Sequence, residues 1–158
     1  MKKFLVMILV LLLAACCAAE GVYDALEMTA TRETVASGFG KLTENGEYFE
    51  IGDALVSFWE SGRLQAKIRA FENAADAAAL TGRSFDAVLK LKQGAPVDKL
   101  ISDLGEGTEI MMINLADEDK SGVRKVLAWK HEDGTVLEAL LEMDSGEWVL
   151  FALTVIEG

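Results

Sequence analysis

The sequence predicts an α+β protein of two tandem units, each a helix-turn-helix packed on one face of an antiparallel sheet. A helical motif recurs at an offset of 65 residues, so that Gly40 and Gly105 fall at equivalent ends. After each copy the hydrophobic period changes from about 3.6 to 2, as at a transition from helix to strand. Short turn signals then separate the strand-like segments, and such turns join antiparallel strands. We therefore expect one unit over residues 23–80 and a second over 81–158.

The residues before these units predict a secreted, lipid-anchored chain. Two lysines precede an apolar run that is too short to cross a hydrocarbon core of about 30 Å. This order is typical of a secretory signal peptide, here over residues 1–15. The ending LAAC at 13–16 resembles the lipobox of bacterial lipoproteins, whose cysteine becomes the lipidated first residue. We expect lipidation of Cys16, a tether over 16–22 and a site on the extracytoplasmic face of a cell-envelope membrane. An ordinary cleaved signal peptide is the alternative.

Composition excludes several classes of partner. The chain carries a formal net charge of −11. An acidic chain is a poor nucleic-acid binder, because that affinity depends on Lys and Arg that neutralise phosphates. Anionic lipid headgroups would repel it as well, so membrane attachment depends on the lipid at Cys16. The other cysteine, Cys17, is adjacent in sequence, so no disulfide is expected within either unit.

The first unit begins with two predicted helices within residues 23–40. Thr31 suits the N-cap of the second helix, because its hydroxyl can accept a hydrogen bond from a free backbone N–H. Gly40 suits the left-handed position just past the end of that helix. The dipeptides Asn45-Gly46 and Ser61-Gly62 predict turns. Strands are expected near 47–51, 54–60 and 63–71.

The second unit repeats this order and adds a strand. Pro96 suits a helix start and Gly105 a helix end, with Leu100 and Leu104 on one apolar stripe between them. Strands are expected near 109–115, 123–131, 135–143 and 147–156. Trp59 and Trp129 each precede a hairpin turn, so we take them as equivalent positions.

Residues 23–40 resemble the repeat of the β-lactamase inhibitor protein (BLIP) family. That repeat runs from an aromatic and an aliphatic residue through Gly-Met-Thr-Arg to a valine and a closing glycine. Thr31, Arg32, Val35 and Gly40 match it. The run 104–106, LGE, resembles the SmpA/OmlA-type outer-membrane assembly lipoproteins. The resemblance implies BLIP-like units whose exposed sheet face contacts a protein partner. The chain departs from BLIP-like inhibitors because it lacks their disulfides, and from the SmpA/OmlA type because it has two units.

The sequence offers little for catalysis. The single histidine, His131, lies between Lys130 and Glu132 and is expected at the surface. Residues 117–122 resemble the start of an EF-hand calcium loop, but the twelfth position is Ala128, where a bidentate Glu is needed. We therefore expect no enzyme activity, no metal and no cofactor.

The aromatic residues are the leading candidates for a binding site. Trp59, Trp129 and Trp148 lie on predicted strands beside hairpin turns, and tryptophan often anchors interfaces. Trp148 leads because alternation places the more apolar face of its strand, with Val149, on the opposite side. Core packing is the alternative for each of them.

These observations predict a lipid-anchored envelope protein that is not an enzyme and holds a protein partner through the exposed sheet face. The alternative is an SmpA/OmlA-type accessory of outer-membrane assembly. A true β-lactamase inhibitor is a third, weaker possibility, because inhibitory loop residues have no counterpart here.

Overall fold

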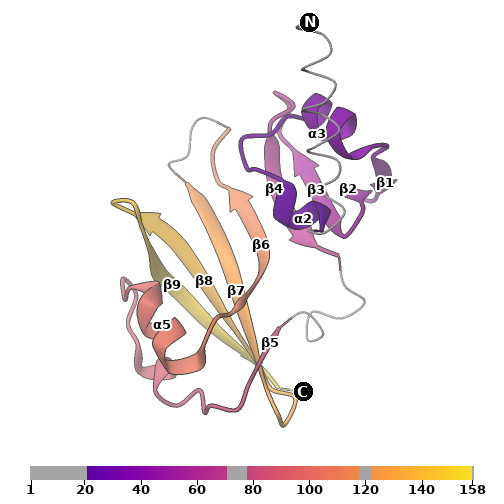
Figure 1. Ribbon diagram of the computed structural model, residues 1–158. Coiled ribbons are helices and arrows are strands. Elements are labelled where there is room, and N and C mark those ends of the chain that lie inside the picture. The colour runs from indigo at the N-terminus through magenta and orange to yellow at the C-terminus, as the bar shows by residue number, and fades with distance from the viewer. Residues whose placement is uncertain (1–20, 71–77, 118–121, 158) are drawn as a thin grey trace, which may run out of the picture. The chain divides into compact units, whose positions relative to one another are not determined.

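The computed structural model describes residues 21–70, 78–117 and 122–157. The chain divides into two compact units, unit 1 over residues 1–70 and unit 2 over 71–158 (Figure 1). The lipobox, Cys16 and nearly all of the tether lie outside the described residues.

Unit 1 is a small antiparallel sheet with two short helices. The strands follow one another in the sheet in the order β1-β2-β3-β4. Its core contains Tyr23, Val35, Val56 and Leu64, all fully buried. The elements are α2 (Val22–Ala25), α3 (Arg32–Phe39), β1 (Thr43–Asn45), β2 (Tyr48–Ile51), β3 (Ala54–Phe58) and β4 (Leu64–Arg69).

Side chains of the sheet hold α2 at both ends. A four-residue helix is far too short to be stable alone, because nucleating a helix costs more than one turn returns. The carboxylate of Asp53 accepts a hydrogen bond from the Tyr23 backbone N–H at 3.0 Å. At the other end, Lys67 Nζ donates to the carbonyls of Tyr23 and Leu26, at 3.0 and 2.9 Å. The anion meets the positive end of the helix and the cation the negative end.

An ion pair also ties α2 to β4. The Arg69 guanidinium donates to both carboxylate oxygens of Asp24, with Nη1 3.0 Å from Oδ2. These hydrogen bonds from Arg69 hold the pKa of Asp24 below its ordinary value. Arg69 and Lys67 also lie over the Tyr23 ring, at 4.2 and 4.4 Å from its centroid. Such cation–π contacts add to the hold on α2.

The helix α3 begins and ends as the sequence predicts. Thr31 accepts a hydrogen bond from the Thr34 N–H, and the Thr34 hydroxyl accepts one from the Thr31 N–H in return. This reciprocal cap satisfies two backbone donors at the helix start. Gly40 follows the last turn with a φ of 106°. A side chain is strained at that angle, so glycine is favoured there.

Unit 2 is a larger sheet with the strand order β6-β7-β8-β9. All these pairings are antiparallel, and β5 adds a short parallel pairing with the end of β7. The helix α5 lies against the β9 side of the sheet (Figure 1). The elements are β5 (Ala79–Thr81), the 3₁₀ turn η1 (Val88–Lys90), α5 (Val97–Leu104), β6 (Thr108–Asn114), β7 (Val123–His131), β8 (Val136–Asp144) and β9 (Glu147–Ile156).

The predicted fold class, α+β units built on helix-turn-helix pairs, is wrong. The described residues are mostly antiparallel sheet and contain few helical residues. In unit 1 the first helix is a single turn, and in unit 2 it is the three-residue 3₁₀ turn η1. Neither segment is long enough to form one arm of a helix pair. The apolar residues read as a first helix, Tyr23 and Val88, fill the core from single turns.

The equivalence of Trp59 and Trp129 is also wrong. In unit 1 the Leu64 N–H donates to the Ala30 carbonyl, and in unit 2 the Leu150 N–H donates to the Ala95 carbonyl, both at 2.8 Å. The segment before each helix therefore bridges to the last strand, which makes β1–β4 equivalent to β6–β9. Trp59 follows the third strand of its unit, whereas Trp129 lies on the second strand of the other. The strand β1 was not predicted, because its residues Thr43–Asn45 are polar and exposed and show no apolar alternation.

Candidate functional site

Trp129 belongs to the core of unit 2 and not to a binding surface. Its side chain is fully buried, and its indole Nε1 donates to the Gly105 carbonyl at 3.0 Å. A Cβ on Gly107 would lie 2.5 Å from the indole ring, so the ring packs directly on that backbone. Trp129 thus fixes the chain just after α5, and the prediction that it binds a partner is not supported by its position.

Trp148 lies on the face of the sheet that carries the core. It is partly buried against the cluster that includes Leu141 and Leu150. The predicted alternation fails because β9 has a bulge opposite Leu140 and Leu141, where Phe151 is the extra residue. One extra residue moves the following side chains to the other face of a sheet. Lys125 Nζ lies 4.5 Å from the centroid of the Trp148 ring.

Trp59 is half-buried at the hairpin between β3 and β4. Its backbone N–H donates to the Arg63 carbonyl at 2.9 Å, which closes the turn. Its indole Nε1 is buried and has no hydrogen-bond partner within the described part of the chain. Because Trp129 is fully buried and Trp148 packs against the core of unit 2, the predicted aromatic set is not an exposed surface.

The opposite face of the unit 2 sheet is the stronger candidate. We define the open face as the side of β6–β9 away from Leu127, Trp129 and the rest of that core. Strand register places several rows of residues across it, of which two neighbouring rows are mostly apolar. The first row is Met111, Val126, Leu140 and Ala152. The second row is Ile113, Arg124, Glu142 and Val149. The open face is therefore mostly apolar over these two rows, with the Arg124–Glu142 pair in the second, while Glu138 and Lys130 lie on the same face further along the strands.

Arg124 is the centre of the open face. Its Nη2 lies 3.2 Å from a carboxylate oxygen of Glu142 on the neighbouring strand. Its guanidinium carbon lies 3.8 Å from the centroid of the Phe151 ring, the side chain that the β9 bulge presents. The Arg124 side chain is 25% exposed, and its buried Nε has no partner within the described residues. An arginine held flat on an aromatic ring and partly exposed is a frequent anchor of protein interfaces.

The group of Arg124, Glu142 and Phe151 was not predicted, although the sequence contains one signal for it. Arg124 and Glu142 are equidistant from Asp133, the middle of the three residues between the strands expected near 123–131 and 135–143. A symmetric hairpin about that turn would have paired them. The contact of Arg124 with Phe151 could not be predicted, because it depends on the bulge.

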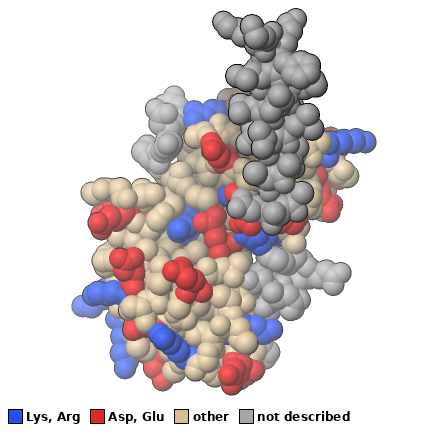
Figure 2. Space-filling view, in the orientation of Figure 1, with Lys and Arg blue, Asp and Glu red and all other residues tan. Residues whose placement is uncertain are grey.

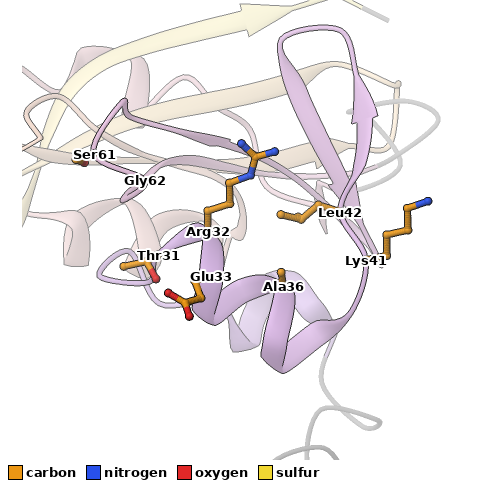
Figure 3. Close-up of a pocket in the computed structure, with 8 residues that line it drawn as sticks. All are labelled: Thr31, Arg32, Glu33, Ala36, Lys41, Leu42, Ser61 and Gly62. Atoms are coloured by element: carbon orange, nitrogen blue, oxygen red, sulfur yellow. The ribbon is translucent and has the colours of Figure 1, made fainter.

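Unit 1 contains a groove beside the start of α3. It has a volume of about 690 Å³. Figure 3 shows Ser61 and Lys41 at opposite ends, so the hydroxyl and the amine do not meet as a nucleophile and base. The Arg32 guanidinium lies 4.3 Å from the centroid of the Phe49 ring. The lining residues are Thr31, Arg32, Glu33, Ala36, Lys41, Leu42, Ser61 and Gly62.

His131 is the last residue of β7 and is partly exposed. Its Nδ1 lies 3.1 Å from Asp133 Oδ1, and its ring contacts Phe85 edge to face. The same Asp133 oxygen accepts a hydrogen bond from the Thr135 backbone N–H at 2.9 Å. That hydrogen bond, with help from His131, lowers the pKa of the Asp133 carboxyl. These contacts order the β7–β8 turn.

The described residues contain no group of three or more His, Cys, Asp or Glu side chains that could hold a metal ion. The loop compared with an EF-hand lies partly outside the described residues, over 118–121. No described helix has both the length and the apolar character needed to cross a membrane. Figure 2 shows acidic and basic side chains interspersed on the visible face, without a single basic patch.

No protein-family model matches the sequence. No curated protein matches it either.

Proposed function

We propose that this chain is a lipid-anchored protein of the cell envelope that holds a protein partner through the open face of unit 2. The observation that carries the proposal is the group of Arg124, Glu142 and Phe151 within the two apolar rows of that face. The proposal replaces the three tryptophans by this group as the binding surface. Attachment to the membrane is proposed through a lipid on Cys16.

The composition of the open face supports a protein partner. Its rows combine half-buried Met111, Ile113 and Leu140 with one arginine, and Met and Arg are enriched at protein interfaces. The ion pair gives the face a polar group that can orient a partner, while the apolar rows supply the area to be buried. A small-molecule site would instead need a deep enclosed pocket with convergent polar groups.

A site-specific crosslink tests the location of the binding surface. A photo-crosslinking amino acid is placed at Ile113 on the open face and, as a matched control, at Leu89 on η1. Leu89 is 48% exposed and lies outside the open face. We expect illumination of intact membranes to attach one recurrent envelope protein to position 113 and none to position 89. Equal adducts from both positions would contradict the proposal.

Lipidation has its own test. Cys16→Ser should abolish incorporation of labelled palmitate and release the chain from the membrane fraction, while Cys17→Ser should leave both unchanged. Retention of label in the Cys16→Ser variant would exclude the proposed anchor. Inhibition assays with a panel of class A β-lactamases test the alternative that the chain is a β-lactamase inhibitor. We expect no strong inhibition of any of these enzymes.

A further inference from the structure

The outer edge of β9 is partly covered and partly free. The Gly94 N–H donates to the Leu150 carbonyl, and the Leu150 N–H donates to the Ala95 carbonyl, both at 2.8 Å. These bonds cover the edge at its start. From Ala152 to Ile156, β9 pairs with β8 on one side and with no strand of the described chain on the other.

The hydrogen-bond pattern between β8 and β9 determines which backbone groups of the free edge point away from β8. Leu150 directs its N–H and carbonyl away from β8, as its bonds to the 94–95 segment show. Antiparallel pairs alternate between bonded and non-bonded, and the bulge places Leu153 two pairs beyond Leu150. Leu153 and Val155 therefore direct their N–H and carbonyl groups outward as well. Four backbone groups on this edge are available to another strand.

The edge strands β1 and β9 differ in how well they are protected against pairing with a strand of another molecule. In unit 1 the edge strand β1 has three exposed residues with Glu44 in the middle, and a short charged edge discourages pairing. In unit 2 the edge strand has no charged residue from Trp148 to Ile156. Val155 and Ile156 are 42% and 44% exposed there. A long uncharged edge with exposed β-branched residues is a template for strand pairing.

We propose that two copies of the chain pair through this edge, antiparallel and with the two-fold axis at Thr154. Leu153 of each copy then lies opposite Val155 of the other, and each such pair exchanges two hydrogen bonds through its outward groups. Ala152 lies opposite Ile156, and Thr154 lies opposite itself. This register uses the whole free edge and only residues within β9. An isologous contact of this kind closes as a dimer and does not propagate.

The charges near the edge agree with a second copy as the occupant. In this register Glu157 faces Phe151 of the other copy, so no two acidic residues of the edge oppose each other. The chain as a whole carries a net charge of −11, which opposes self-association. Salt screens that repulsion, with a Debye length of about 8 Å at physiological ionic strength. The dimer should therefore become tighter as the salt concentration rises, the opposite of an association driven by charge attraction.

A charge swap at Thr154 tests the register. Thr154 is exposed, but Glu138 lies opposite it on β8, so Thr154→Lys should leave the unit intact and Thr154→Glu should weaken the β8–β9 pairing slightly. Both variants are first shown to be folded. Like charges directly opposite each other destabilise paired strands, so each variant alone should dissociate at least about tenfold more readily. Mixing the two variants should restore a mixed dimer, because Lys then faces Glu. Thr43→Lys on the β1 edge is the matched control and should dimerise like the wild type.

The experiment is sedimentation of the full chain in a mild detergent, with amide hydrogen exchange on the same samples. We expect a dimer whose formation protects the amides of Leu153 and Val155 as concentration rises. The Thr154 amide, bonded within the sheet, should be protected at all concentrations. A wild type that stays monomeric at about 0.1 mM in high salt would overturn the proposal, since micromolar binding would give mostly dimer there. Unchanged dimerisation of Thr154→Lys and Thr154→Glu would overturn it equally. Neither outcome decides whether the open face binds a partner, because the hydrogen bonds of the dimer come from Leu153 and Val155, which do not lie on that face.

Discussion

The two units hold their helices on their sheets in different ways. In unit 1 the buried cation of Lys67, 5% exposed, donates to the last carbonyls of α2. In unit 2 the neutral hydroxyl of Thr81 donates to the Leu104 carbonyl at the end of α5, at 3.1 Å. The indole of Trp129 adds a bond to the next carbonyl. The exposed Arg83 guanidinium donates to the Ser102 and Asp103 carbonyls of the same helix end, at 2.7 and 2.9 Å. The same problem, free carbonyls at a helix end, is therefore solved by a buried charge in unit 1, and in unit 2 by neutral donors in the core with an arginine at the surface.

This difference has a consequence for how each unit responds to change. A buried charge depends on every one of its partners, because an unpaired buried charge is costly. Neutral donors inside an apolar core fail more gradually, through lost packing. Unit 1 should therefore be sensitive to loss of its buried cation, and unit 2 to loss of core volume.

The largest effect is expected in unit 2. Trp129→Ala removes a fully buried side chain and should cost roughly 3–5 kcal/mol of unfolding free energy. Denaturant unfolding followed by hydrogen exchange of each unit measures it, and protection in β7 and β8 should fall while that in β3 and β4 persists. Trp129→Phe, which keeps most of the volume, should cost clearly less. A cost near zero would mean that the ring does not support the core.

Loss of the buried cation in unit 1 should lower the free energy of unfolding by a somewhat smaller amount. Lys67→Met leaves the carbonyls of Tyr23 and Leu26 without their donor and should cost about 3 kcal/mol. Protection of backbone amides against hydrogen exchange should fall in unit 1 alone. Lys41→Met, at an exposed lysine of the same unit, is the control and should change little. If Lys67→Met proved neutral or stabilising, the idea that the cation holds α2 would fail.

Substitution of Gly107, whose backbone packs on the Trp129 ring, tests the same contact from the opposite partner. Gly107→Ala places a Cβ about 2.5 Å from the indole ring, so the ring or the backbone must move. We expect a loss of about 2 kcal/mol from overpacking. This loss of unfolding free energy should disappear when Gly107→Ala is made in the Trp129→Ala variant, where the clash is absent. Full additivity of the two changes would contradict this contact.

The smallest effect is the pH dependence of unit 1. The hydrogen bonds from Arg69 lower the folded-state pKa of Asp24. A lowered carboxyl pKa stabilises the fold above the unfolded value of about 3.9. That contribution is lost as the pH falls below this value, through the folded-state pKa. Because Asp24 is 47% exposed, Asp24→Asn should cost only about 0.5 kcal/mol at neutral pH. The difference from wild type should vanish in acid, and a constant difference at every pH would exclude the pair as its source.

Much of the strand order follows from local sequence. The expected strands near 123–131 and 147–156 lie where β7 and β9 do, because clear turn signals such as Asp144-Ser145-Gly146 bound them. The caps at Thr31 and Gly40 depend on neighbouring residues and were predicted for that reason.

The rest depends on contacts between distant residues. The β9 bulge reversed the face of Trp148, and nothing in the alternation of residues 147–156 marks Phe151 as the extra residue. The weight given to helices was wrong because short apolar turns such as Val22–Ala25 and Val88–Lys90 have helical spacing but depend on the sheet for stability. The candidate binding group at Arg124 requires both the hairpin register and the bulge.

The central claim is that the open face of unit 2, and not the tryptophans, binds the partner. The measurement is the amount of the crosslinked envelope protein recovered from intact membranes with Arg124→Ala and with Trp148→Ala, each first shown to be folded. We predict that Arg124→Ala weakens recovery about tenfold or more, as for an interface anchor, and that Trp148→Ala leaves it near wild type. The reverse pattern, loss with Trp148→Ala and full recovery with Arg124→Ala, would contradict the account.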